Sequence, residues 1–221
     1  MRFSSKANRP AFTVIELIVL VGTIILLALV LIPGLIHARQ RAQRIHCVSY
    51  LKQIGLSFRI WSPDSDDKFP MARSTNRQGT LEFANEVWRT FQVLSNELGT
   101  PFILACPADS RRPAANFSTL ANTNISYFIA LEAEEVLPEF PLAGDRFLTT
   151  GHPTVQKILT IRSNDVPTWA GQGHQGGGNM ALADGSVQQM NSAKLQEVVT
   201  NALRLNLEAH TNAILRLAMP E

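Results

Sequence analysis

The stretch Ala11-Phe12-Thr13-Val14-Ile15-Glu16-Leu17-Ile18 begins an apolar run that continues to Ile36. No residue from Leu17 to Ile36 is charged, and a helix made of this run would be about 30 Å long, the thickness of the hydrocarbon core of a bilayer. We therefore predict that residues 12–36 form a transmembrane helix, for which the lipid bilayer is an expected partner.

The polar leader, residues 1–11, carries Arg2, Lys6 and Arg9 and no acidic residue. Positive charge beside an apolar segment keeps that flank in the cytoplasm, so the rest of the chain should be exported. A secretory signal peptide has a similar charge pattern, but its small-residue cleavage site follows the apolar region. Here the small residue Ala11 precedes the apolar region, and this order argues against an ordinary signal peptide.

Glu16 lies at the cytoplasmic edge of the predicted span. A charged carboxylate inside a bilayer costs about 3 kcal/mol unless it reaches the interface or finds a partner. One interpretation is an acid in the first turn of a helix, where the helix dipole favours negative charge. The other is an acid that pairs with a charged amine on a neighbouring subunit.

The basic leader, the segment Ala11 to Glu16 and the apolar run together resemble the processing site of type IV prepilins and of type II secretion pseudopilins. The resemblance implies that a prepilin peptidase cleaves between Ala11 and Phe12 and that the new terminus, Phe12, is N-methylated. It also implies that Glu16 meets the first amine of an adjacent subunit during assembly. Ala11 departs from the glycine that is usual before the cut, so we expect slower cleavage.

Three further elements resemble a bacterial group of pilin-like proteins named after its His-x9-Asp-Gly (H-X9-DG) motif. His174 is followed, after nine residues, by Asp184-Gly185-Ser186-Val187. Residues 47–56 resemble the group's Asn-Leu-Lys-Gln-Ile-Gly-Leu helix segment, with Tyr50 where Asn is usual. Cys106-Pro107-Ala108-Asp109 resembles its Cys-Pro-x-Asp element. With the N-terminal signal, these elements extend the resemblance over nearly the whole chain.

Helical periodicity continues beyond the apolar run, and we predict one helix from about Phe12 to Trp61. Its second half, residues 37–61, is expected to be periplasmic and to pack on a globular domain. The less polar positions recur at spacings of three or four and are expected to form the packed face: Ala38, Ala42, Ile45, Val48, Leu51 or Lys52, Gly55 and Phe58.

The remaining residues predict a mixture of helices and strands. A second amphipathic helix is expected at 81–98, strands are expected at 125–131, 146–150 and 157–162, and a helix that Ser192 caps is expected to run to about Leu207. The segments on either side of Asp184-Gly185 predict a β-hairpin with a type I′ turn. The tail after residue 210 is left without a firm assignment.

Cys47 and Cys106 both fall in the part of the chain that should be exported. An oxidising compartment favours disulfides, and an even number of cysteines allows both to pair. A bond between them would enclose 58 residues and stabilise the fold by about 4 kcal/mol in the chain-entropy model. The alternative is two separate buried thiols.

His174 and Asp184 raise the question of a catalytic or metal site beside a glycine-rich loop. Such a site needs further groups that converge on one point, which spacing alone does not establish. We therefore expect structural roles: Asp184 forms or caps the hairpin turn, and His174 bonds its side chain or nearby backbone. Asp64, Asp66 and Asp67 are interpreted as turn residues, with calcium as the alternative, and no other metal or cofactor is expected.

The charge of the exported part argues against one class of partner. The whole chain has a formal net charge of +2, and loss of the three leader cations leaves 2 − 3 = −1. Proteins that bind nucleic acid rely on basic surfaces that neutralise phosphates. A nucleic-acid partner is therefore not expected.

The resemblance implies a pilin-like α+β fold, in which the long N-terminal helix packs on a small antiparallel sheet. Its expected parts are the leader 1–11, the assembly helix 12–36, the periplasmic continuation 37–61 and the globular domain 62–221. The resemblance implies a non-enzymatic pseudopilin or minor pilin of a type II secretion or type IV pilus-like fibre. Its implied partners are the prepilin peptidase, other pilin or pseudopilin subunits and the inner-membrane assembly platform.

Location follows from the same interpretation. We expect a single-pass inner-membrane protein with a cytoplasmic N-terminus and a periplasmic domain, which later joins a periplasmic or surface fibre. Two alternatives stay open at this point. One is a signal-anchored periplasmic enzyme or metal-binding protein that works at His174, Asp184 and the aspartates near Asp66. The other is a surface adhesin or DNA-uptake pilin.

Overall fold

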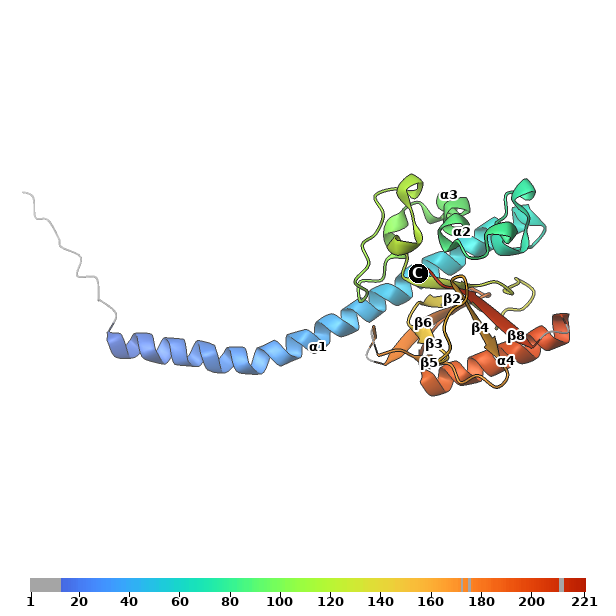
Figure 1. Cartoon of the computed structure of the whole chain (residues 1–221). Helices are drawn as coiled ribbons and strands as arrows, with labels where there is room; N and C mark the ends of the chain where they lie inside the picture. The colour runs from blue at the N-terminus through green and yellow to red at the C-terminus, as the bar shows by residue number, and fades with distance from the viewer. Residues whose placement is uncertain (1–12, 172, 175, 211–212) are drawn as a thin grey trace, which may run out of the picture. The chain divides into compact units, whose positions relative to one another are not determined.

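The computed structural model describes residues 13–171, 173–174, 176–210 and 213–221. The chain divides into two units, Met1–Arg41 and Ala42–Glu221. Helix α1, Val14–Trp61, contributes residues to both units (Figure 1). Ala11 and Phe12, between which cleavage is predicted, lie outside the described residues.

In the first unit, α1 carries the uncharged apolar run as a continuous helix that includes Pro33. Large apolar side chains are exposed on all sides of it, among them Val14, Leu20, Leu29 and Ile36. A helix that is apolar all round is stable only where lipid or other helices cover it. Within the described parts of the chain, α1 is the one helix that is long and apolar enough to cross a membrane.

In the second unit, one side of α1 is buried. Its buried apolar residues follow a spacing of three and four: Cys47, Leu51, Ile54, Phe58 and Trp61. Leu51 and Phe58 are buried and confirm the predicted packed face. Nearer the N-terminus of the helix the prediction was wrong, because Ala42 and Ile45 are exposed. Apolar residues occur on more than one side of this segment, so periodicity alone did not select the face that the sheet covers.

An antiparallel sheet with the strand order β4-β8-β1-β2-β6-β7 forms the centre of the second unit. Its strands are β1 Tyr127–Ala130, β2 Pro141–Asp145, β4 Ile158–Arg162, β6 Gly177–Leu182, β7 Val187–Asn191 and β8 Ile214–Ala218. A separate pair joins β3, Leu148–Thr149, to β5, Thr168–Trp169. The predicted α+β class with a small antiparallel sheet is confirmed.

Two strands outside the hairpin, β1 and β4, were predicted well, whereas β2, β5 and β8 were missed. β1 and β4 lie inside the predicted ranges 125–131 and 157–162, whereas the range 146–150 contributes only the short strand β3. β2 has the sequence Pro-Leu-Ala-Gly-Asp, and proline, glycine and aspartate are depleted in strands. It forms because β1 and β6 pair with it from both sides.

A single continuous helix was predicted at 81–98, and this prediction is wrong. The structure has a 3-10 turn η4 at Leu81–Phe83, then α2 at Val87–Val93 and α3 at Ser95–Leu98. The side chain of Asn122 bonds the chain at the start of α2: its Oδ1 accepts the Trp88 N–H at 3.2 Å and its Nδ2 donates to Asn85 O at 3.4 Å. These long-range bonds replace helical ones and interrupt the helix.

Short 3-10 turns complete the connection between α1 and β1. They are η1 Pro63–Ser65, η2 Pro70–Ala72, η3 Thr75–Arg77, η5 Pro101–Leu104, η6 Phe117–Thr119 and η7 Asn122–Asn124. The predicted break after Trp61 is confirmed, since Asp66 and Asp67 adopt left-handed conformations with φ of 58° and 54°. Short polar side chains tolerate this conformation better than most residues.

The hairpin of β6 and β7 is present, but its turn differs from the prediction. The Leu182 N–H donates to Ser186 O and the Gly185 N–H donates to Leu182 O, both at 2.9 Å, so three residues, Ala183 to Gly185, lie inside the last hydrogen-bonded pair. Gly185 has a φ of 82°, whereas Asp184 is not in the left-handed region, so a type I′ turn is excluded. A three-residue loop that ends in a left-handed glycine is the next common way to close a hairpin.

Helix α4, Ser192–His210, confirms the predicted terminal helix. Leu195, Val198, Val199, Ala202 and Leu203 are buried on its inner face as predicted, and Leu205 is half-buried. The cap was assigned to the wrong residue: Asn191 Oδ1 accepts the Lys194 N–H at 2.9 Å, whereas Ser192 Oγ accepts the Trp169 N–H at 3.2 Å.

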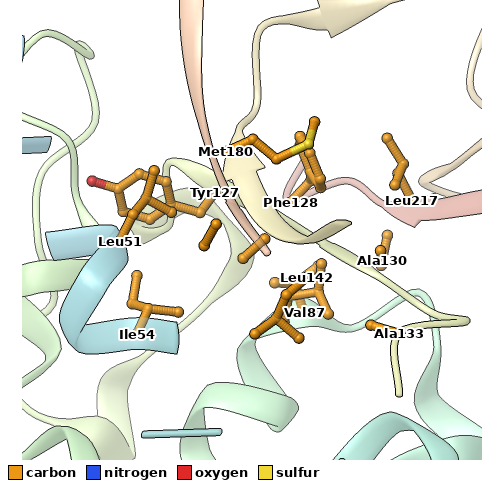
Figure 2. Packing of buried hydrophobic residues seen from close by; sticks show 14 of the residues in the cluster. Leu51, Ile54, Val87, Tyr127, Phe128, Ala130, Ala133, Leu142, Met180 and Leu217 are labelled. Carbon is orange, nitrogen blue, oxygen red and sulfur yellow. The ribbon is translucent and has the colours of Figure 1, made fainter. Parts of the chain in front are cut away.

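The core of the second unit lies between its part of α1 and the sheet, and between the sheet and α4, which cover opposite faces of the sheet (Figure 1). Figure 2 shows side chains from α1, β1 and β6 in this one cluster, including Leu51, Ile54, Tyr127, Phe128 and Met180. Each of these five is fully or almost fully buried. Burial of one such side chain stabilises the fold by about 1.5–3 kcal/mol.

Candidate functional site

Thr13 and Glu16 cap the start of α1. The backbone N–H and the hydroxyl of Thr13 each donate to Glu16 Oε2 at 2.9 Å, and Thr13 Oγ1 accepts the Glu16 N–H at 3.4 Å. This reciprocal arrangement is a capping box, in which the two side chains satisfy backbone donors of the first turn. Capping boxes accept Glu or Gln at this position, so the cap by itself does not require a negative charge at Glu16.

Four buried side chains with metal-ligating atoms meet in the second unit. Cys47 comes from α1, Cys106 from the loop after η5, Asp145 from the end of β2 and His174 from the loop before β6. Their exposed fractions are 0, 2, 1 and 6%. One ligand atom from each lies within 4.8 Å of all the others, and in the described residues this is the one such group of three or more side chains.

Short contacts join the four side chains. The Cys47 thiol donates to Asp145 Oδ1 at 3.1 Å. His174 Nε2 lies 3.5 Å from Cys106 Sγ and 3.5 Å from Asp145 Oδ2. The hydroxyl of Tyr127, on β1, lies 3.4 Å from Cys47 Sγ. The group is therefore a connected polar cluster inside an apolar core.

Neighbouring backbone and amide groups hold the cluster in place. Asn179 donates to Asp145 Oδ2 through its backbone N–H at 2.7 Å and through Nδ2 at 2.9 Å. The Ala108 N–H points at Cys106 Sγ at 3.4 Å. Both sets of donors favour negative charge on the atom that accepts them, here an oxygen of Asp145 and the sulfur of Cys106.

An ion pair next to the cluster fixes two of its chain segments to each other. Arg146 donates to Asp109 through Nε at 2.7 Å and through a terminal nitrogen at 3.0 Å. Arg146 follows Asp145 in the chain, and Asp109 belongs to the loop that carries Cys106. The bidentate pair therefore sets the distance between the two segments, and Asp109 gains a role that its place in the Cys-Pro-x-Asp element did not reveal.

The two thiols of the cluster have pKa values shifted in opposite directions. Burial raises the pKa of the Cys47 thiol, whereas the interaction with the neighbouring Cys47 sulfur lowers the pKa of Cys106 to about 5. Burial also raises the pKa of Asp145 to about 6. Burial by itself would lower the pKa of His174, but the hydrogen bond with Cys106 and the charge of Asp145 outweigh it and raise the pKa. These shifts favour ionisation of Cys106 over ionisation of Cys47, and protonation of His174.

The geometry argues against a Cys-His-Asp catalytic triad. In a triad, the histidine uses one ring nitrogen for the nucleophile and the other for the acid that orients it. Here the same nitrogen, His174 Nε2, faces both Cys106 and Asp145. All three side chains are also buried, so a substrate has no access to the sulfur of Cys106. The arrangement fits a structural role better than a catalytic one.

The two cysteines are free thiols in the structure, and both are buried. Their sulfur atoms lie within 4.8 Å of each other although 58 residues separate them in the chain. The predicted disulfide is therefore not formed here, but the fold does bring together the two residues that would form it. The bond itself stays a prediction.

His174 and Asp184 are not partners, and this part of the sequence interpretation was wrong. Asp184 forms the hairpin turn as predicted, because its Oδ1 accepts the Ser186 N–H at 2.8 Å. Its backbone oxygen accepts a hydrogen bond from Arg59 at 2.8 Å. His174 bonds instead within the buried cluster, with Cys106 and Asp145. His174 and Asp184, which nine residues separate in the sequence, thus have two separate structural roles.

The aspartates after α1 are exposed and spread apart. The carboxylate of Asp66 lies 3.6 Å from Arg73, and Asp66 and Asp67 serve the turn through their left-handed backbones. Asp64, Asp66 and Asp67 do not form a converging set of ligand atoms in this described segment. The interpretation as turn residues is confirmed.

Sequence reasoning missed Asp145 as a site residue. It stands at the end of Pro-Leu-Ala-Gly-Asp, in a stretch that gave no strand signal. A single aspartate between apolar residues and Arg146 was the available sign, but an aspartate in such a segment is usually a turn residue. Only the pairing of β2 with β1 and β6 brings it to Cys47 and His174.

No protein-family model, no curated protein and no solved structure matches this chain. Two features of the chain bear on its function: the apolar helix with Glu16 at its start, and the buried cluster of Cys47, Cys106, Asp145 and His174.

Proposed function

We propose that this protein is a pseudopilin or minor pilin, which a prepilin peptidase cleaves between Ala11 and Phe12 and which then assembles into a type II secretion or type IV pilus-like fibre. Before assembly the apolar half of α1 lies in the inner membrane, with the N-terminus in the cytoplasm and the second unit in the periplasm. The proposal assigns no enzymatic activity to the chain.

The observation that carries this proposal is the character of α1 in the first unit. It is apolar and exposed along its whole uncharged run, with one acid, Glu16, at its start. In lipid, such a helix is stable as a single copy, and in a fibre, the same surface packs against the helices of other subunits. One sequence segment thus serves both states without refolding.

Glu16 then has two tasks. It caps the helix with Thr13, and its negative charge compensates the amine of Phe12 on the adjacent subunit. The second task needs charge, because an amine in the apolar centre of a helix bundle is costly unless an anion pairs with it. Cleavage between Ala11 and Phe12 would create that amine. The processing site and the assembly role of Glu16 are therefore linked.

The first experiment identifies the N-terminus of the protein recovered from membranes of peptidase-competent cells. We expect a chain that starts at N-methylated Phe12, detected by the mass of the N-terminal peptide. A chain that still starts at Met1 would exclude prepilin processing and leave a signal-anchored protein.

The second experiment separates the two tasks of Glu16. Glu16→Gln retains the capping box and loses the charge, so we expect normal cleavage but incorporation into fibres reduced at least about tenfold. Thr13→Val is the matched control, because it removes the side-chain cap and leaves the charge. Normal incorporation of the Gln variant would refute the assembly role of Glu16.

A second candidate function is a membrane-anchored periplasmic metal-binding protein. The buried cluster of Cys47, Cys106, Asp145 and His174 favours it. The two functions are not exclusive, since the cluster lies in the core of the second unit and leaves the apolar helix available for assembly. The N-terminal mass decides whether the pilin interpretation applies.

A further inference from the structure

We infer that the second unit holds a structural zinc ion, bound by Cys47 Sγ, Cys106 Sγ, His174 Nε2 and a carboxylate oxygen of Asp145. The inference does not depend on the proposed assembly into a fibre. It rests on the geometry, the donor set, the burial and the charge of these four side chains.

The distances suit a tetrahedral ion. Zinc lies about 2.3 Å from sulfur and about 2.0–2.2 Å from nitrogen or oxygen, so the ligand atoms of one site are about 3.3–3.8 Å apart. The separations are 3.1 Å from Cys47 Sγ to Asp145 Oδ1, 3.5 Å from Cys106 Sγ to His174 Nε2, and 3.5 Å from His174 Nε2 to Asp145 Oδ2. One ligand atom from each of the four side chains lies within 4.8 Å of the other three, so these atoms would have to approach one another by about 1 Å at most to match such a site.

The donor set selects the kind of metal. Calcium and magnesium prefer oxygen ligands, whereas thiolates with imidazole are typical of zinc sites. Two sulfurs, one ring nitrogen and one carboxylate oxygen belong to the second class. Four protein ligands with exposed fractions of 0–6% leave no open position for substrate, which indicates a structural site.

Charge gives an independent reason. Asp145 is 1% exposed, and His174 is the basic group paired with it among the described ion pairs. A buried carboxylate is costly unless positive charge compensates it, and the two thiols beside it lose their protons when they bind a metal. With both cysteines and Asp145 ionised, a divalent ion leaves −3 + 2 = −1. The guanidinium of Arg44, which bonds Asn179 and the Gly178 carbonyl at 3.5 and 3.4 Å, stands beside the cluster to offset that charge.

The groups around the cluster match the outer shell of a metal site. Metal-binding carboxylates are themselves hydrogen-bonded, and this orientation is part of their affinity. Asn179 holds Asp145 with two donors, and the Ala108 N–H supports Cys106. The Asp109–Arg146 pair fixes the segments that carry Cys106 and Asp145. The ion would then join α1, the loop after η5, β2 and the loop before β6 at one point.

A disulfide between Cys47 and Cys106 is the competing state. It uses both sulfurs, so a chain with this bond does not bind zinc at the cluster. The disulfide would join α1 only to the loop after η5, whereas the ion would also join β2 through Asp145 and the loop before β6 through His174. The experiment therefore measures metal and thiols on the same sample.

The test uses the full-length protein, purified in detergent from its native compartment without chelators. Zinc is measured by elemental mass spectrometry, and free thiols are measured by alkylation of the denatured protein with and without a chelator. We expect about one zinc per chain and two thiols that become alkylated. The zinc content of His174→Gln and of Cys106→Ser should be at least about tenfold lower than that of the wild type. Asn179→Ala should weaken zinc affinity by about 10–100-fold.

His152→Gln is the matched control, because His152 has a side chain that is 69% exposed and should leave the zinc content unchanged. Circular dichroism of each variant establishes that it is folded. The proposal is overturned by a metal-free chain with an intramolecular disulfide, by a metal-free chain with two free thiols, or by zinc that persists in both ligand variants.

Discussion

Truncation of Leu51 tests which side of α1 the sheet covers. Leu51 is fully buried in the core cluster with Ile54 and Tyr127 (Figure 2). Leu51→Ala removes three buried carbons, and at about 0.8 kcal/mol for each this costs about 2.4 kcal/mol of transfer free energy. The cavity left behind adds to that value, so we expect a loss of about 3–4 kcal/mol in the free energy of unfolding.

The assay is denaturation of the detergent-solubilised chain, followed by tryptophan fluorescence. The three tryptophans, Trp61, Trp88 and Trp169, all belong to the second unit, so the signal reports on that unit and not on the apolar part of α1. For a unit of this size, the expected loss corresponds to a decrease in Tm of about 10 °C.

Ile45→Ala is the matched control on the same helix. Sequence periodicity places Ile45 on the packed face, but its side chain is 59% exposed in the structure. We expect a change within about 0.5 kcal/mol, as is usual for exposed positions. Equal losses for both variants, or a larger loss for Ile45→Ala, would refute the orientation of α1 described here.

Two further variants test the surroundings of the sheet. Asp109→Asn should cost about 1.5–3 kcal/mol, because Asp109 accepts both hydrogen bonds from Arg146. Burial tends to raise the pKa of Asp109, but these bonds outweigh it and lower the pKa. The stability difference between the wild type and Asp109→Asn, measured by denaturation across pH, should therefore be constant above about pH 4 and vanish as the pH falls through the lowered pKa; a difference that persists in acid would contradict this. Asn191→Ala should cost about 1 kcal/mol by removing the cap of α4, whereas Asn201→Ala, at an exposed position of the same helix, should not show a cap effect. Equal Tm values for the two variants would instead mean that the cap contributes nothing.

Several elements follow from local sequence alone. The uncharged run after Glu16 forms a helix because every backbone donor and acceptor inside such a segment is satisfied within it, whatever surrounds it. The hairpin at Asp184-Gly185 forms because glycine adopts the left-handed conformation that a tight loop needs. Helix α4 follows from apolar residues at helical spacing. In each case, the cause lies within a few residues of the effect.

Strand β2 could not be predicted in this way. Its composition disfavours a strand, and it exists because β1 and β6 pair with it on both edges. Gly144 illustrates the dependence: a Cβ there would lie 2.7 Å from the ring of Phe128 on β1, a residue 16 positions away in the sequence. Glycine is depleted in strands, but here the absence of a side chain allows β1 and β2 to approach each other.

The sequence by itself determined the apolar helix, the polar leader, Glu16 and the hairpin motif, because hydrophobicity, charge order and turn chemistry are local properties. It also named Cys47, Cys106 and His174 without showing that they meet. The tertiary structure decided that His174 faces Cys106 and Asp145 rather than Asp184. It could do so because pairing between distant strands, and not spacing along the chain, sets which side chains share the core.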